Sequence, residues 1–254
     1  MRAFIAFTKK EVMEQIRTYK WLIVLSVFFL FGMMSPLMAK LMPDILSGME
    51  MQGMKIEIPN PTVLDAYGQF FKNFTQIGWV VILLVFGATL SNELVKGTLI
   101  NILSKGLSRP IVILSKFTAA VLLWSVGFAV ACVTCYGYTF YLFRNAFAPN
   151  LLFSFFCLWL FGCFIISLIL LSGTLANGTF GGLVLSTSIL VVMLVISISP
   201  KSDEFNPITL VSKNINLLNE SIGVKDLLSP IIITAVLTIT SLYFAILLFR
   251  RKKM

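Results

Sequence analysis

The chain has 254 residues and a formal net charge of +9, with 58% of its residues hydrophobic and only 12% charged. A soluble domain carries about 25% charged residues, so this composition excludes an ordinary water-soluble protein and indicates a multi-pass membrane protein. The sequence contains no histidine, which excludes HExxH metalloproteases and catalytic triads that use histidine as the base. Because the lysines and arginines gather at both ends and in one internal loop, the net charge reflects membrane topology, and we predict no binding to nucleic acid.

Residues 1–20 form the first predicted element, a helix that lies in the cytoplasmic headgroup layer. At the helical period, the apolar side chains of Ile5, Val12, Ile16 and Tyr19 share one face, and charged side chains share the other. This pattern is typical of interfacial helices, which bury an apolar face at the membrane surface. An ordinary charged lead-in to the first membrane span is the alternative.

Six apolar segments follow, and each is long enough to cross a bilayer whose hydrocarbon core is about 30 Å thick. The predicted spans are residues 21–41, 73–91, 117–142, 151–172, 181–199 and 228–249. Residues 43–72 and 200–227 are predicted to be extracellular, whereas the basic loop 92–116 and both termini are predicted to be cytoplasmic. The sequence therefore predicts one all-α integral membrane domain over residues 1–254, with six transmembrane helices.

The cytoplasmic loop over residues 92–116 carries the most specific pattern of the chain. Ser91 and Asn92 can cap the start of a short helix, and Gly106 can end it. Pro110 is suited to the first turn of the next helix. The loop thus predicts a short helix beneath the membrane that a soluble partner can push, with a plain connecting loop as the alternative.

The same loop resembles that of ABC transporter permeases of the type-2 exporter class, whose pattern is Glu, Gly-Thr, Leu-Leu-Ser, Ser-Arg and Lys. The matching positions are Glu93, Gly97, Thr98, Leu103, Ser104, Ser108, Arg109 and Lys116. One departure is Gly106-Leu107, where many members place a proline shortly before the Ser-Arg. The N-terminal helix, the six spans and the basic tail also resemble that family, so the resemblance covers the whole chain.

The resemblance implies both a function and a set of partners. In that family the loop carries a coupling helix that docks in a cleft of a separate ATPase subunit. Glu93, Lys105 and Arg109 would be the contacts and pivots of that coupling here. Two permeases meet two ATPases in the family, so we expect a second permease, as a homodimer, with ATP and Mg²⁺ bound by the partner ATPase. The chain has no GxxxxGK(S/T) segment to cradle phosphates, so we expect a transport permease and not an enzyme.

The interiors of the predicted spans contain no Asp, Glu, Lys or Arg. Ion-coupled carriers usually need such residues at depth, so the sequence favours a hydrophobic or amphipathic cargo, such as a peptide, a lipid-like molecule or a drug. The candidates for lining a pathway are the polar residues Ser125, Thr134, Tyr136, Tyr138, Ser167 and Asn177. Each of them is also explained as a polar group that is satisfied within its own helix or at a helix interface.

Two further features leave alternatives open. Met49, Met51 and Met54 carry soft thioethers that can hold Cu(I), but the many neighbouring methionines favour a flexible apolar cover, and we predict no metal site. Gly181 and Gly182 permit close helix approach, either in a dimer or within the bundle.

We therefore expect the membrane-spanning permease of an ATP-driven exporter, located in the cell membrane of a bacterium. A non-transporting membrane scaffold or immunity protein is the alternative. Dependence of function on ATP hydrolysis separates these two classes, and the lipid bilayer is a partner of the chain in both.

Overall fold

The computed structural model of the chain is built from helices, turns and short irregular segments over the residues that it describes. Those residues are 2–47, 60–95, 97–104, 106–176, 178, 180–199 and 204–252. No strand occurs among them. The structure thus confirms the predicted all-α class.

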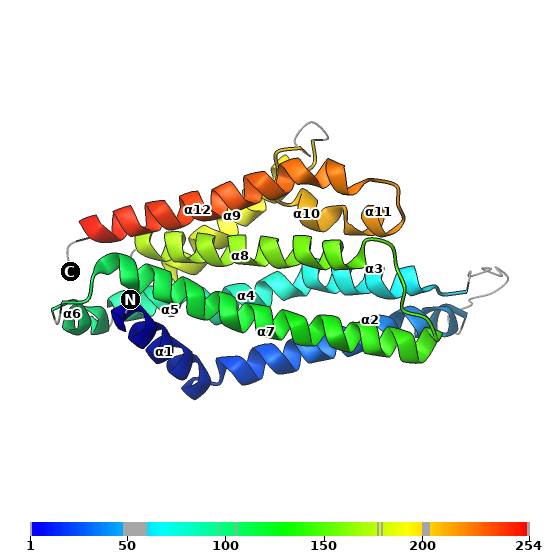
Figure 1. Ribbon diagram of the computed structural model, residues 1–254, viewed down its shortest axis with the longest axis horizontal. Helices are drawn as coiled ribbons and strands as arrows, with labels where there is room; N and C mark the ends of the chain where they lie inside the picture. The colour runs from blue at the N-terminus through cyan, green and yellow to red at the C-terminus, as the bar shows by residue number, and fades with distance from the viewer. Residues whose placement is uncertain are drawn as a thin grey trace.

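The helices follow one another along the chain as Figure 1 shows. They are α1 (Arg2–Arg17), α2 (Lys20–Ser47), α3 (Val63–Asn73), the π-helix η1 (Phe74–Gly78), α4 (Trp79–Phe86), α5 (Thr89–Val95), α6 (Thr98–Leu103), α7 (Arg109–Phe143), α8 (Leu151–Leu175), α9 (Gly181–Ile196), α10 (Thr209–Ser212), α11 (Asn214–Leu218), the 3-10 helix η3 (Val224–Leu227) and α12 (Leu228–Arg251). Several of them are the long apolar helices that the sequence predicts.

Five segments of the described chain are long and apolar enough to cross a membrane. They are Lys20–Ile45, Val63–Val95, Arg109–Phe143, Leu151–Leu175 and Val224–Arg251. These segments are compatible with a multi-pass membrane protein. The helix at the fifth predicted span, α9, has 16 residues and is a shorter apolar helix.

The second long segment, Val63–Val95, begins before the predicted span of 73–91. Its first turn is fixed by a capping box: the Thr62 side chain accepts a hydrogen bond from the N–H of Asp65, and the Asp65 carboxylate accepts one from the N–H of Thr62. The turns that follow bury aromatic side chains against neighbouring helices. The cap and this buried face extend the helix into the predicted outer segment 43–72.

The helices surround α8, which is largely buried. It packs against α7, α9 and α12, whereas α2 packs along α7 and against α3. The first helix, α1, packs on α7 near the point where α7 begins (Figure 1). This arrangement makes α7 the element that joins α1 and α2 to the centre of the bundle.

A set of stacked and tilted rings fills the middle of the bundle between α2, α3, η1 and α7. We call Phe28, Phe70, Phe74, Trp124 and Phe128 the aromatic core. The ring centroids of Phe70 and Phe74 are 4.7 Å apart, and those of Phe28 and Phe74 are 5.0 Å apart. Trp124 and Phe128 stack at 5.0 Å. Such spacings are favourable for aromatic pairs, so this region is held by shape and by apolar burial.

Small residues allow α8 to approach its neighbours closely. A Cβ at Gly162 would overlap the indole ring of Trp124 on α7, which is almost fully buried. On the other side, Gly182 of α9 lies against Gly173 of α8 and the side chain of Ser91. The close approach at Gly182 therefore serves packing within the chain, one of the two uses that the sequence left open.

One end of the bundle brings together segments that are far apart in the sequence. Figure 1 shows that α1 begins, α12 ends and α6 lies at this end, which we call the loop end. The end of α2, the start of α3 and the turn from α7 to α8 lie at the opposite end. The start of α1, the end of α12 and the described part of the basic loop therefore share one end of the bundle.

Candidate coupling site

A buried lysine joins three helices at the loop end. The Nζ atom of Lys116 on α7 lies 2.8 Å from Oε2 of Glu11 on α1 and 2.7 Å from Oε2 of Glu93 on α5. The exposed fractions of these side chains are 1% for Lys116, 3% for Glu11 and 12% for Glu93. A buried charge is costly unless it is paired, so these contacts hold the three helices in one geometry.

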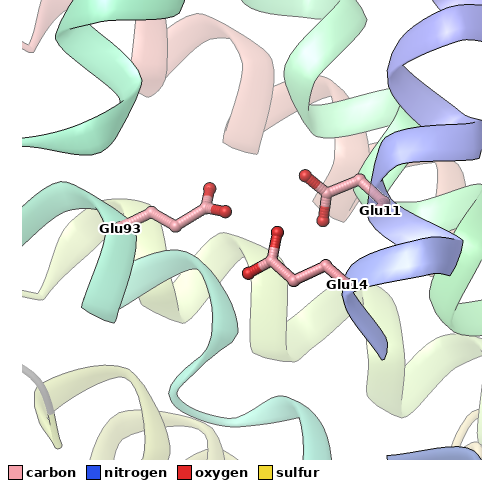
Figure 2. Close-up of side chains that lie close together, drawn as sticks. All are labelled: Glu11, Glu14 and Glu93. Atoms are coloured by element: carbon pink, nitrogen blue, oxygen red, sulfur yellow. The ribbon is translucent and has the colours of Figure 1, made fainter. Parts of the chain in front are cut away.

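A second lysine extends the contact toward solvent. The Nζ atom of Lys10 lies 3.1 Å from Glu11, 3.1 Å from Glu93 and 2.6 Å from Glu14. We call Lys10, Glu11, Glu14, Glu93 and Lys116 the charge network, and Figure 2 shows its three carboxylates converging from α1 and α5. The network joins residues that are up to 105 positions apart in the sequence.

The charge network favours the charged form of its more exposed members. Burial acts to lower the pKa of Lys10, but the hydrogen bond to Glu14 and the charges of Glu11 and Glu93 outweigh it, so this pKa is raised. Burial acts to raise the pKa of Glu14, but its hydrogen bond with Lys10 and the nearby lysine charges outweigh it, so this pKa is lowered. Both residues therefore remain charged at neutral pH.

The three carboxylates of the charge network lie close enough to one another for a metal site, since their oxygen atoms fall within 4.8 Å. Their partners are already lysine ammonium groups: Lys116 contacts Glu11 and Glu93, and Lys10 contacts all three. A divalent cation would have to displace these ammonium groups. The arrangement is therefore suited to holding helices together and not to binding a metal ion.

The first helix has the predicted division into two faces, but part of its charged face is buried. Ile5, Ile16 and Tyr19 are exposed and Val12 is half-buried, as expected for a face turned toward lipid. The opposite face packs on α7, and Glu11 is buried there. Sequence reasoning missed this burial, although Lys116 and Glu93, which flank the predicted spans, are the two charges that would have indicated a partner.

The 92–116 region contains two short helices, the end of α5 and α6, where the sequence predicted one. Gly97, with φ of 66°, separates α5 from α6, and Gly106, with φ of 90°, separates α6 from α7. The expected cap at Ser91 and Asn92 is wrong, because both lie inside α5, and the N–H of Asn92 donates to the carbonyl of Ala88. The predicted end at Gly106 is confirmed, since left-handed backbone suits glycine.

The residues of the family-like pattern divide between the interior and the surface. Glu93 and Lys116 are paired in the charge network, and Leu103 is half-buried against the apolar cluster beneath the loop. Thr98, Ser104 and Ser108 are exposed, Gly97 is half-exposed, and Lys105 lies outside the described residues. The exposed members all lie on or beside α6, so the loop presents a polar surface at the loop end.

Arg109, at the start of α7, holds the end of α12. Its guanidinium donates hydrogen bonds to the carbonyl oxygens of Phe249, Arg250 and Lys252, at 2.9, 2.6 and 3.0 Å. Lys252 in turn donates from Nζ to the carbonyl of Thr174 at 2.9 Å, at the end of α8. Cations are favourable at helix C-termini, so these contacts fasten α7, α8 and α12 to one another.

Within the described part of the chain, the candidates for a pathway lining are distributed along α7 and α8. Ser125 accepts a hydrogen bond from Trp159 Nε1 at 2.9 Å, and Ser167 donates to the carbonyl of Phe164 at 2.7 Å. Thr134 lies against Gly32 of α2. The remaining candidates are Tyr138, which is half-buried, Tyr136, which lines an apolar groove of about 850 Å³ near the opposite end, and Asn177, which lies outside the described residues. Met49, Met51 and Met54 also lie outside the described residues.

Comparison with known proteins gives this chain no family. No protein-family model matches it, and no curated protein matches it. The resemblance of the 92–116 loop to the type-2 exporter permeases thus rests on the residues of that loop. The ion pairs and helix contacts at the loop end are the structural features that bear on function.

Proposed function

We propose that this chain is the membrane-spanning permease subunit of an ABC exporter, and that α5 and α6 carry its coupling loop. The observation that carries the proposal is the pairing of Lys116 with both Glu93 and Glu11. This contact joins the loop to α7, which follows it, and to the interfacial helix α1. A displacement of α6 by a docked ATPase would therefore reach three helices together.

The contacts around α6 favour the transmission of a displacement to neighbouring helices over independent movement of α6. Leu99 of α6 is almost fully buried in the apolar cluster that also holds Phe7 of α1 and Phe249 of α12. Interiors are packed densely and transmit displacement, so an element fixed on one side and exposed on the other is suited to pass on a push. The exposed side of α6 carries Thr98 and is followed by Ser104.

We propose that α9 is a sixth crossing. An even number of crossings places both termini on one side of the membrane, and α1 begins at the same end at which α12 finishes (Figure 1). The 16 residues of α9 give about 24 Å of helix, which is shorter than a hydrocarbon core of about 30 Å. Bilayer thinning accommodates a mismatch of this size at modest cost. The loop end then faces the cytoplasm, because it carries the excess of basic residues.

The complete transporter in this proposal has two permeases and two ATPases in a bacterial cell membrane. ATP and Mg²⁺ bind to the ATPase, and the pathway lies between the permeases. The interiors of the six predicted spans contain no Asp, Glu, Lys or Arg, and this lack of a charged site for a coupling ion favours a hydrophobic or amphipathic cargo. Tyr136 lines an exposed apolar groove on α7 and α8 that suits such a cargo.

The test is co-purification of the chain with its partner from the native membrane. We expect a stoichiometric P-loop ATPase with the unmodified chain, and its loss when Thr98→Arg and Ser108→Arg place bulky charges on the exposed loop surface. Ser221→Arg is the matched control, because Ser221 is exposed outside the loop and its variant should retain the ATPase. Recovery of the folded chain without any ATPase would contradict the proposal and favour the scaffold or immunity protein.

A further inference from the structure

One polar side chain of the second long segment faces outward without a partner. Gln76 is exposed inside Val63–Val95, a segment long and apolar enough to cross a membrane. Its side chain makes no hydrogen bond to any residue that the structure describes. By contrast, Gln69 and Asn73 on the preceding turns hydrogen-bond to each other at 3.3 Å. The carboxamide of Gln76 therefore has donors and an acceptor left for a partner outside the described chain.

The depth of Gln76 makes an unpaired amide costly. Thr89 accepts a hydrogen bond from Lys20, at which the first long apolar segment begins, so Thr89 marks one boundary of the hydrocarbon. At 1.5 Å per residue, Gln76 lies about 20 Å from Thr89 along the segment, within a hydrocarbon core about 30 Å thick. Water does not supply hydrogen bonds in that layer, so a polar group there needs another partner.

The π-helix η1 holds the amide outward. Phe74 and Gly78, at the two ends of this π-helix, are buried, whereas the three residues between them are exposed. Single π-helical turns are rare and occur frequently at functional sites. Thr75 donates back to the carbonyl of Phe71 at 2.7 Å, so its hydroxyl is satisfied within its own helix. Gln76 is thus the polar side chain of this turn that is left for a partner.

The surface beside Gln76 is hollowed. An apolar cavity of about 180 Å³ lies between η1, α4, α8, α9 and α10, and both Gln76 and Val80 line it. Residues four apart share one side of a helix, so these two exposed side chains lie on the same face. A cavity of about 150 Å³ accepts a benzene ring, so this hollow can receive a bulky apolar side chain. Ile77, which is exposed at the same depth, is a side chain of that kind.

We infer that this face binds a second copy of the chain and that the two Gln76 side chains hydrogen-bond to each other. A carboxamide carries a donor and an acceptor side by side, so two of them can form a reciprocal pair across a twofold axis. Two copies inserted in the same orientation bring equal residues to the same depth. Gln76 then meets Gln76, and Ile77 of one copy meets the hollow of the other.

The chemistry of the amide favours a protein partner over lipid. Lipid tails offer no polar group, whereas Gln and Asn side chains hydrogen-bond between helices within membranes. The inference names the contact between the two permeases of the proposed function, and it rests on that proposal for the presence of a second copy. It needs no ATPase, so it can be tested separately.

The test is the dimer dissociation constant of the full chain in lipid bilayers. Energy transfer between labelled copies measures it over a range of protein-to-lipid ratios. We expect Gln76→Leu to weaken the dimer about tenfold, and Gln76→Asn, which keeps a carboxamide, to weaken it less. Thr240→Leu is the matched control, because Thr240 is a partly exposed polar residue of α12 that bonds to the carbonyl of Val236 in its own helix. That variant should dimerise like the unmodified chain.

Two further measurements control for folding and locate the contact. Gln76→Leu removes an exposed amide without a partner, so the thermal midpoint of the variant in detergent should not fall below that of the unmodified chain. Under oxidation, Val80→Cys should form a disulfide between copies, whereas Ile239→Cys, at an exposed site on α12, should not. The unmodified chain gives the background from its own four cysteines.

Three results would overturn the inference: a monomeric unmodified chain, a dimer that Gln76→Leu leaves unchanged, or cross-linking through Ile239→Cys in place of Val80→Cys. If Gln76→Leu alters transport but not the dimer, the amide contacts cargo and the inference is also wrong. Co-purification of the ATPase is a separate measurement. An intact dimer without an ATPase contradicts the proposed function alone, and an ATPase bound to a dimer insensitive to Gln76→Leu contradicts this inference alone.

Discussion

At the loop end, α1, α5 and α7 are joined by the ion pairs of Lys116, whereas in the middle of the bundle α2, α3 and α7 are joined by the rings of the aromatic core. Rings pack by shape and tolerate no charge, so the middle is fixed once its side chains interdigitate. Ion pairs depend on every partner being present and charged. The loop end is therefore the region in which a small chemical change can release a whole helix.

The largest effect is expected from Lys116→Met. This variant removes the buried partner of Glu11 and Glu93 and leaves them only Lys10, which is partly exposed, so the cost should approach the roughly 3–5 kcal/mol of a broken buried pair. The free energy of unfolding in detergent is the measurement. Lys9→Met, at an exposed site on α1, should change it little.

The double variant Lys116→Met with Glu11→Gln sharpens the comparison. It removes the charge of one of the two carboxylates that lose Lys116 as a partner, so it should regain part of the lost stability. If Lys116→Met unfolds at the same denaturant concentration as the unmodified chain, the ion pairs do not hold the loop end. That result would contradict the contrast between a loop end held by ion pairs and a bundle centre held by aromatic packing.

The second effect concerns the middle of the bundle. Gly162→Ala places a methyl group in the space of the Trp124 ring, and overpacking of this kind costs about 1–3 kcal/mol. Thermal unfolding followed by tryptophan fluorescence measures it. Gly137→Ala is the matched control, because a Cβ there meets open space, and it should stabilise α7 by about 0.5–1 kcal/mol. Equal effects of the two substitutions would contradict the packing argument.

A smaller effect is expected from Arg109→Gln. The variant keeps a donor but loses the cation at the end of α12, which is worth about 0.3–1 kcal/mol. Amide hydrogen exchange in the last turn of α12 should become faster, while exchange in α2 should not change. Unchanged exchange near Phe249 would show that the three hydrogen bonds are dispensable.

The smallest effect is a pH dependence of α1. The pKa of Glu14 is lowered in the folded chain, so its contribution is present above the unfolded value of about 4.3 and is lost as the pH falls through the folded value. Hydrogen exchange in α1 should therefore quicken as the pH falls below the unfolded value and through the lowered folded value, after correction for intrinsic exchange. Glu14→Gln should remove this component, and a pH profile identical to that of the unmodified chain would contradict it.

The long helices could be predicted because their signal is local. Uncharged stretches bounded by charged residues give the all-α class, and the starts of α8 at Leu151 and α12 at Leu228 agree with the predicted spans. The start of α3 was missed because its cap at Thr62 lies in a segment whose prolines and acidic residues indicate an exposed loop. The capping box at Thr62 and the buried aromatic face of α3 stabilise the helix in spite of that composition.

The charge network could not be predicted in full, because its partners are distant in sequence. Glu93 and Lys116 were both recognised as members of a pattern, but that pattern gives no distance between them. The helical period places Glu11 on the charged face of an interfacial helix, and it indicates no partner for that carboxylate. Glu11 reaches Lys116 only because α1 packs on α7. The spacing of apolar residues along α1 does not show that residues of its polar face are buried.

The contacts of Arg109 and Lys252 have a consequence for biosynthesis. Both join α7 and α8 to the end of α12, which follows them along the chain. Chains begin to form structure from the N-terminus during synthesis. Helices α7 and α8 therefore lack these hydrogen bonds until α12 has left the ribosome. In a chain truncated before α12, the start of α7 and the end of α8 lack these contacts. Cellular proteases can recognise such incomplete chains by these unpaired helix ends.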